Sequence, residues 1–200
     1  MEFIGTKPLE TERLILRRAT LADADVAYQS WCTSDAVAKY VMWEKHKSVN
    51  ETRAIYTKWI EAYQDLDTYR WIAELKDTGE VIGTIDISKK FLPYGTCEVG
   101  YCYAEKYWGQ GYGTEILMRV IKFLFEECDA DIIVGEHMDN NPASGRVMEK
   151  SGLKYETRLR ARINDKMGRK NDLIVYSLTK EEYEKEKQNG WSCKNFNRKA

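Results

Sequence analysis

Residues 108–137 read WGQGYGTEILMRVIKFLFEECDADIIVGEH, and this stretch decides the fold of the chain. Its middle part carries apolar residues at the spacing of one helix face, namely Ile116, Leu117, Val120, Ile121, Leu124 and Phe125. The short apolar segment 131–137 is typical of a strand, and an alternating segment, 98–103, precedes the glycines. Because a strand, a helix and a second strand in this order form a crossover unit, we expect the two strands to be parallel.

Toward the N-terminus the patterns predict one strand, two helices and a meander. Residues 12–18 alternate as a strand does, and Thr20 with Asp23 three residues later forms a variant of the capping box before a helix. A second helix is expected after Ser48, with one face made of Ile55, Trp59, Ile60 and Tyr63. Residues 70–103 alternate around short turns, which favours antiparallel hairpins.

Toward the C-terminus, Asn141 and Pro142 are expected to open another helix, and Gly152 to close it. Two strands, 155–163 and 172–178, flank a turn at Gly168. The complete prediction is an α/β fold with a mixed sheet in the order β-α-α-β-β-β-α-β-α-β-β, followed by a C-terminal helix. We expect one domain over residues 1–189 and a tail over residues 190–200.

Composition excludes several classes of protein. The 200 residues carry 31 basic and 32 acidic side chains, without the basic excess typical of nucleic-acid binding. No apolar run approaches the roughly 20 residues of a membrane span, and the N-terminus has no signal-peptide pattern. The five cysteines include no C-x-x-C pair, so reduced thiols and a cytoplasmic location are expected. No metal site is predicted.

The glycines at 109, 111 and 113 predict a binding site for a phosphate group. They stand between a predicted strand and the strongest predicted helix, whose first N–H groups lack partners within the helix. Glycine lets a ligand approach the backbone closely, so the segment suits a diphosphate. A Walker loop is excluded because no Gly-Lys pair is present, and Thr114 stands where the dinucleotide fingerprint requires its third glycine.

Two stretches resemble motifs of the GNAT superfamily of N-acyltransferases. EVGYCYAEKYWGQGYGTEIL resembles its acetyl-CoA signature, [QR]-x-x-G-x-[GA], with Gly111 and Gly113 at the small positions and Trp108 where Gln or Arg is usual. MDNNPASGRVMEKSGLKYE resembles its second motif, N-x-x-[SA]-x-x-[VL]-x-E-K-x-G-[FL], which begins at Asn141. The opening TERLILRRATLADAD is similar to the Rim-type branch, which acetylates N-termini of ribosomal proteins. The resemblance covers roughly residues 8–180 and implies the GNAT fold.

The resemblance implies a cofactor, acetyl-CoA, and residues that would bind it. Backbone groups on the strand before the glycines would contact the pantetheine arm, and the loop would hold the diphosphate. Asn141 would reach the pantetheine, and Arg146 could face a phosphate. The implied cofactor-binding set is Tyr101, Cys102, Tyr103, Trp108, Gly109, Gln110, Gly111, Tyr112, Gly113, Thr114, Asn141, Ser144 and Arg146.

The resemblance also implies direct transfer of an acetyl group to a primary amine. Glu98 is the expected base. The tyrosine that many relatives use as proton donor is replaced by Met148, so Ser144 is the expected hydrogen-bond donor to the sulfur. A covalent route through Cys102 is a minor alternative, because nothing in the sequence activates its thiol. His137 is expected to be packed rather than catalytic.

The acceptor pocket would be lined by Trp31, Tyr40 and Trp43, although aromatic residues at such spacing also build cores. The expected acceptor is a protein or peptide N-terminal amine. A small-molecule amine or antibiotic, and a non-catalytic acyl-CoA-binding module, remain alternatives, as does a nucleotide-binding domain. No nucleic-acid or membrane partner is expected, and a homodimer is compatible with the resemblance.

Overall fold

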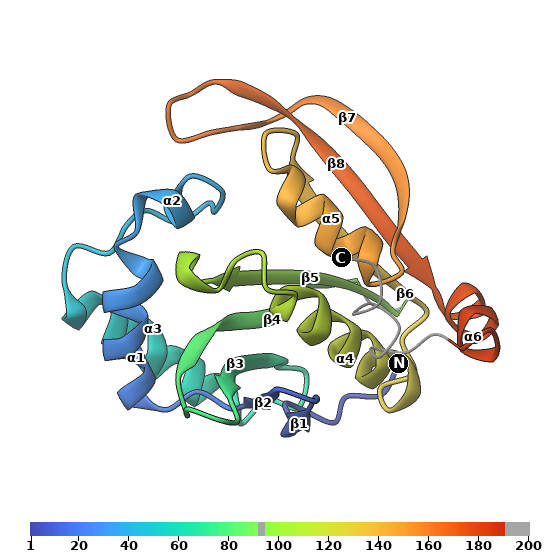
Figure 1. Cartoon of the computed structure of the whole chain (residues 1–200), viewed down its shortest axis with the longest axis horizontal. Coiled ribbons are helices and arrows are strands. Elements are labelled where there is room, and N and C mark those ends of the chain that lie inside the picture. Colours follow the sequence, from blue (N-terminus) through green and yellow to red (C-terminus); the bar gives the residue numbers. More distant parts are fainter. Residues whose placement is uncertain (92–94, 191–200) are drawn as a thin grey trace. The chain divides into compact units, whose positions relative to one another are not determined.

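The computed structural model describes residues 1–91 and 95–190. Within these residues, eight strands form one mixed sheet in the order β1-β2-β3-β4-β5-β6-β8-β7 (Figure 1). The strands are β1 (Leu9–Glu10), β2 (Leu14–Arg17), β3 (Arg70–Leu75), β4 (Val81–Phe91), β5 (Thr96–Tyr103), β6 (Ile132–Met138), β7 (Lys154–Asn164) and β8 (Lys170–Thr179). Strands β5 and β6 pair in parallel, as the crossover predicts.

The helices follow the predicted order, but the structure adds one short helix and two single turns to them, and β1 to the predicted strands. They are α1 (Leu21–Ala27), the π-helical turn η1 (Tyr28–Cys32), α2 (Asp35–Ala38), α3 (Val49–Ala62), the 3-10 turn η2 (Glu105–Tyr107), α4 (Tyr112–Glu126), α5 (Pro142–Lys150) and α6 (Lys180–Gln188). The mixed α/β fold class is therefore confirmed. None of the helices in the described ranges is both long and apolar enough to cross a membrane. The predicted tail lies almost wholly outside the described residues, which end at residue 190.

The chain divides into two compact units, and β4 and β5 each run through both. The N-terminal unit comprises Phe3–Ile87 and Gly100–Tyr112. The C-terminal unit comprises Met1–Glu2 and the described residues of Ser88–Val99 and of the chain from Gly113 onward. The predicted single domain over residues 1–189 stays a prediction.

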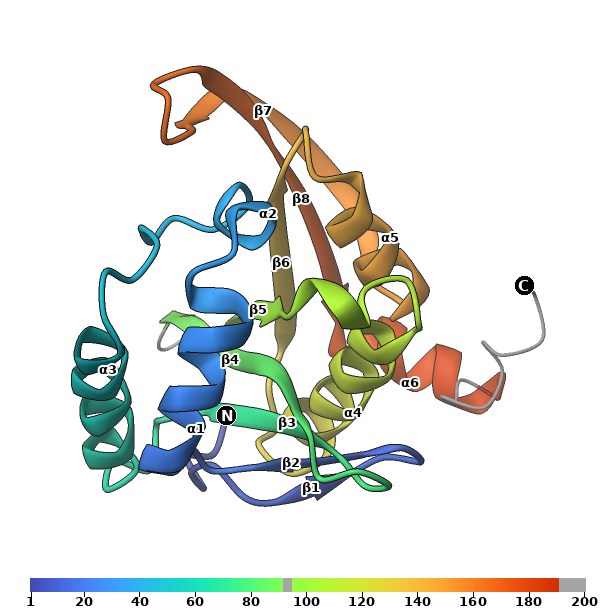
Figure 2. The same ribbon diagram turned by 60° about the vertical axis from the view of Figure 1, so that its left-hand side comes forward.

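The N-terminal unit is built on antiparallel strands. Leu14 and Leu16 of β2 are fully buried, and Leu16 pairs with the equally buried Ala73 of β3. Helices α1 and α3 lie side by side (Figure 2). Helix α3 begins after Ser48 as predicted, and the Oγ of Ser48 caps it by accepting a hydrogen bond from the N–H of Glu51.

The face of α3 that packs against the unit overlaps only in part with the predicted one, since Ile55 and Trp59 are half-buried. The buried residues are Thr52 and Tyr56, and Tyr63 beyond the helix end is buried too, whereas Ile60 is exposed. The prediction left out Tyr56, which lies on the most buried side of the helix. An aromatic ring with one hydroxyl group buries far more apolar surface than polar surface.

The C-terminal unit carries the crossover helix and a long hairpin. Helix α4 buries the predicted apolar face, including Ile116, Val120 and Ile121. Strands β7 and β8 form the hairpin, and Gly168 in its turn has a φ of +75°, as a glycine turn requires (Figure 1). Gly152, with a φ of +95°, follows α5 in the predicted left-handed conformation.

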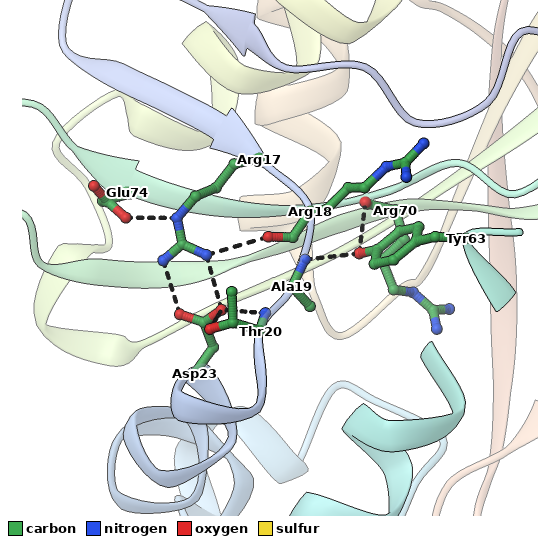
Figure 3. A network of polar contacts seen from close by, with 8 residues as sticks. All are labelled: Arg17, Arg18, Ala19, Thr20, Asp23, Tyr63, Arg70 and Glu74. Carbon is green, nitrogen blue, oxygen red and sulfur yellow. Dashed lines mark hydrogen bonds and ion pairs between the residues drawn. The ribbon is translucent and has the colours of Figure 1, made fainter. Parts of the chain in front are cut away.

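A buried carboxylate joins the start of α1 to the sheet (Figure 3). Asp23 accepts a hydrogen bond from the Thr20 N–H at 2.7 Å, and two from Arg17, each at 2.8 Å. Arg17 also donates from Nε to Glu74 on β3 at 2.6 Å. Burial raises the pKa of Asp23, but the hydrogen bonds from Arg17 and Thr20 lower it by more, so the pKa lies below its ordinary value. The carboxylate form of Asp23 is therefore the one that stabilises the contact between α1 and the sheet.

Replacing Asp23 by alanine should lower the free energy of unfolding by about 2–4 kcal/mol at pH 7, because Arg17 loses its buried partner and α1 loses its cap. Since the folded pKa is depressed, this contribution is complete above the unfolded pKa of about 3.9 and is lost as the pH falls through the folded pKa. Urea unfolding at pH 7 and at about pH 3 measures the difference.

Asp25 on the same helix provides the matched control. It accepts a similar forked pair of hydrogen bonds from Arg53, at 2.8 and 2.9 Å, but on the protein surface. Asp25→Ala should therefore change stability much less at either pH. Equal losses for the two variants at pH 7 would contradict the role given to the buried network.

Candidate active site

The glycine loop, residues 108–112, connects the 3-10 turn η2 to the first residue of α4. Gly109 and Gly111 have φ angles of +75° and +82°, a conformation that residues with a Cβ seldom adopt. Within the described residues, no protein acceptor is found for the backbone N–H groups of Gly109, Gln110 or Gly111. Three successive open N–H groups directly before a helix N-terminus form a backbone site suited to an anion.

Side-chain hydrogen bonds hold both ends of the loop. The indole of Trp108 donates to the carbonyl of Tyr103, at the end of β5, over 2.8 Å. The side chain of Gln110 donates to the carbonyl of Lys106, also over 2.8 Å. The backbone N–H of Trp108 already donates to Glu105 over 3.0 Å, so the open N–H groups begin at Gly109. Trp108 therefore anchors the loop through its side chain. Its backbone N–H, which was expected to bind the ligand, is already occupied.

The predicted pantetheine-binding residues of β5 lie in the same unit as this loop. The rings of Tyr101 and Tyr103 stack with their centroids 5.7 Å apart. Burial, with smaller contributions from Cys32 and Asp86, raises the pKa of the Cys102 thiol to about 12. Since the thiolate is the nucleophilic form, Cys102 is protonated near neutral pH, which disfavours the covalent route.

Two of the three aromatic residues predicted to line the acceptor pocket are partly exposed. Tyr40 has its ring centroid 6.5 Å from that of Trp108, and Trp43 lies 5.4 Å from the ring of His46. Trp31, in contrast, is 2% exposed. Trp31 is therefore a core residue of the N-terminal unit, and only Tyr40 and Trp43 are accessible for an acceptor.

The other predicted site residues lie in the C-terminal unit. Asn141 caps α5, and its Oδ1 accepts a hydrogen bond from the Ser144 N–H over 3.4 Å. Glu98 on β5 pairs in register with Val134 of β6, and Arg146 is exposed on α5. Thr114, in the first turn of α4, accepts a hydrogen bond from the Ser151 hydroxyl over 3.4 Å. This contact joins the first turn of α4 to the end of α5, and hence the two sequence motifs.

Met148 occupies a packing position rather than a polar one. It is 1% exposed, and a Cβ built on Gly135 of β6 would lie 3.0 Å from its sulfur. His137 is also packed, as predicted: its ring stacks on Tyr176 at 5.7 Å, and its Nδ1 lies 2.7 Å from the carbonyl of Met138. Neither residue is placed to donate a proton to a ligand in solvent.

Sequence reasoning missed Arg13, whose guanidinium contacts the glycine loop. Its Nη1 donates to the carbonyl of Gln110 over 3.1 Å, across a separation of 97 residues. Only the TERL resemblance pointed to this part of the chain, and it assigned Arg13 no role. A contact between residues so far apart in the sequence produces no periodic pattern from which it could be predicted.

Comparisons with a family model and with a related protein both indicate an N-acetyltransferase. A family model described as an acetyltransferase (GNAT) domain matches residues 13–154. YoaA, an uncharacterized N-acetyltransferase of Bacillus subtilis (strain 168), is 30% identical over 172 residues, which cover 86% of this chain and 96% of that protein.

Two solved structures have the same fold. A GNAT-family acetyltransferase from Bacillus anthracis has a TM-score of 0.77 at 23% identity, covering 88% of this chain and 99% of that one. RimL, a ribosomal L7/L12 alpha-N-protein acetyltransferase in complex with coenzyme A, has a TM-score of 0.76 at 18% identity, covering 86% and 98%.

Proposed function

Because the chain belongs to the acetyltransferase (GNAT) family and uses acetyl-CoA as acetyl donor, we propose that its acceptor is the α-amino group of a protein or peptide. The observation that carries the proposed donor site is the run of three open N–H groups at Gly109, Gln110 and Gly111. These groups suit the diphosphate of acetyl-CoA, and the left-handed glycines suit its close approach. When bound, acetyl-CoA supplies an acetyl group activated as a thioester.

The acceptor proposal is supported by the acid–base chemistry of amines. The attacking nitrogen must be neutral. An α-amino group, with a pKa of about 7.7–8.0, is partly neutral at physiological pH, whereas a lysine side chain, at about 10.4, needs a stronger base. The only base proposed in this chain is one carboxylate, Glu98. The Rim-type resemblance of residues 11–25 and the fold shared with RimL support the same class of acceptor.

In the proposed reaction, the amine nitrogen forms a bond to the acetyl carbon and the carbon–sulfur bond breaks. Glu98 accepts the proton that the amine loses. Ser144 donates a hydrogen bond to the departing thiolate, the task for which Met148 has no suitable group. A backbone N–H of β5, in the stretch Tyr101–Tyr103, polarises the carbonyl. We also propose a cytoplasmic location, which the thiol form of Cys32, Cys97, Cys102 and Cys128 supports.

The first test is calorimetric titration with acetyl-CoA, with CoA, NAD and ATP as comparisons. Saturable binding of acetyl-CoA, with weaker or no binding of NAD and ATP, is expected. Preference for NAD or ATP would overturn the assignment of the loop.

Peptides with a free α-amino group are then compared with N-terminally blocked, lysine-containing peptides and with small polyamines and aminoglycosides, with mass spectrometry as readout. Transfer to the free N-terminus is expected. Transfer only to small amines, or to none of the acceptors, would contradict the proposal.

Glu98→Gln and Ser144→Ala should each lower kcat by about 100-fold, because acid–base groups contribute roughly that much. The Kd for acetyl-CoA should remain within about twofold of wild type in Glu98→Gln, because Glu98 is not among the residues proposed to bind the cofactor. Unchanged kcat in either variant would remove that residue from the mechanism.

A further inference from the structure

Arg13 lies where the chain enters β2, and its backbone is held on both sides. The Thr11 N–H donates to the Leu14 carbonyl over 3.0 Å, and the Leu14 N–H donates to the Thr11 hydroxyl over 2.9 Å. The carbonyl of Arg13 accepts a hydrogen bond from the Lys76 N–H over 3.0 Å. Leu14, the next residue, is fully buried and pairs with Leu75 of β3. Arg13 therefore projects from a fixed point of the sheet.

The guanidinium of Arg13 contacts three successive residues of the glycine loop. Its Nη1 donates to the carbonyl of Gln110 over 3.1 Å. Its Cζ lies 4.1 Å from the centroid of the Tyr112 ring, within the range of a cation–π interaction. A Cβ built on Gly111 would lie 3.5 Å from Nη2, so the side chain passes directly beside that glycine.

These contacts set the orientation of one peptide unit. In a trans peptide, the carbonyl of one residue and the N–H of the next point in opposite directions. Because the Gln110 carbonyl points toward Arg13, the N–H of Gly111 points away from it. Glycine at position 111 makes the flipped orientation of this peptide sterically accessible as well. Arg13 selects one of the two orientations and adds a positive charge beside the proposed diphosphate site.

We propose that Arg13 is a positioning residue for acetyl-CoA: it holds the peptide between Gln110 and Gly111 with its N–H open to the diphosphate. The inference rests on the proposed role of the glycine loop as the diphosphate site. It assigns to the N-terminal segment of the chain a part in donor binding that is separate from amine recognition and proton transfer.

The test replaces Arg13 by glutamine, which removes the charge and the planar fork but retains most of the aliphatic stem. The Kd for acetyl-CoA measured by calorimetry should rise about tenfold, the effect of losing one hydrogen bond to a charged group. With an amine found in the acceptor screen, the KM for acetyl-CoA should rise while kcat stays within about twofold. Arg13→Lys should recover part of the affinity, because it restores the charge without the fork.

Arg18 provides a matched control within the same unit. It donates from Nε to the carbonyl of Thr6 over 2.9 Å, and its Cζ lies 5.2 Å from the centroid of the Tyr63 ring. It thus makes the same two kinds of contact, but with residues outside the glycine loop. Arg18→Gln should leave the Kd for acetyl-CoA unchanged, and the Tm of both variants is measured alongside.

The outcomes separate this inference from the proposed function. Absence of acetyl-CoA binding by the wild-type protein would overturn the proposed function itself. Wild-type binding with an unchanged Kd in Arg13→Gln would overturn only the role of Arg13. An equal loss of affinity in Arg13→Gln and Arg18→Gln would also overturn it, because the effect would then follow general stability. A loss confined to Arg13→Gln, with partial recovery in Arg13→Lys, would support it.

Discussion

Replacing Gly111 by valine is expected to weaken acetyl-CoA binding by about 100-fold or to abolish it. Gly111 has a φ of +82°, and a β-branched residue in this conformation costs about 1–3 kcal/mol. The loop relieves that strain by changing conformation, and the open N–H groups of Gly109, Gln110 and Gly111 then lose their common orientation. Bulk added at this position also enters the space beside the Arg13 guanidinium. Calorimetric titration of the purified variant measures the effect.

Gly79 offers the control for Gly111. It lies in the same unit with a φ of +69°, and a Cβ there would meet no atom within 4 Å. Gly79→Val therefore introduces the same backbone strain in a turn that has no proposed role in binding. Its Tm should fall about as much as that of Gly111→Val, while its Kd for acetyl-CoA stays at the wild-type value. Wild-type affinity in Gly111→Val would show that the diphosphate binds elsewhere.

Replacing Gly83 by alanine should lower the free energy of unfolding by about 3 kcal/mol or more. A Cβ on Gly83 of β4 would lie 2.5 Å from Cδ1 and 2.8 Å from Cα of Tyr103, and closer still to the carbonyl oxygen of Cys102. The Cys102 oxygen and the Tyr103 Cα are backbone atoms of β5. The steric clash can therefore be relieved only if the two strands move apart. Overpacking of this kind costs about 1–3 kcal/mol even where side chains can adjust. Urea unfolding measures the loss.

The same substitution should also weaken acetyl-CoA binding, because Cys102 and Tyr103 are proposed to contact the pantetheine arm. Gly135 on β6 serves as the comparison: a Cβ there would lie 3.0 Å from the sulfur and Cε of Met148, the flexible end of a side chain. Gly135→Ala should therefore cost clearly less stability than Gly83→Ala. Equal losses would contradict the distinction between backbone and side-chain neighbours.

Local patterns predicted most of the secondary structure because their causes are local. The apolar spacing of residues 116–125 identified α4, and side-chain capping identified the starts of α3 at Ser48 and α5 at Asn141. The part of the buried α3 face that local patterns did not predict has a different cause. The side of a helix that is buried depends on what packs against it, and Tyr56 and Thr52 are buried by the rest of the N-terminal unit.

In the candidate site, too, some features have local causes and others depend on the tertiary structure. The glycine loop and the Asn141 helix start were readable because short segments carry their own conformational requirements, such as a positive φ or an N-cap. The burial of Trp31 and the packed position of Met148 were decided by tertiary packing. The anchoring of the loop by the Trp108 indole depends on the fold of residues 103–108, which brings the Tyr103 carbonyl to the ring.

Local sequence patterns were enough to predict the main strands and helices, the parallel crossover and the family. Only the tertiary structure brought Arg13 to the glycine loop, across 97 residues. The physical reason is that apolar periodicity specifies which residues are buried but not which polar groups meet. A long side chain such as arginine can find its hydrogen-bond partner only after the sheet has fixed the positions of both backbones.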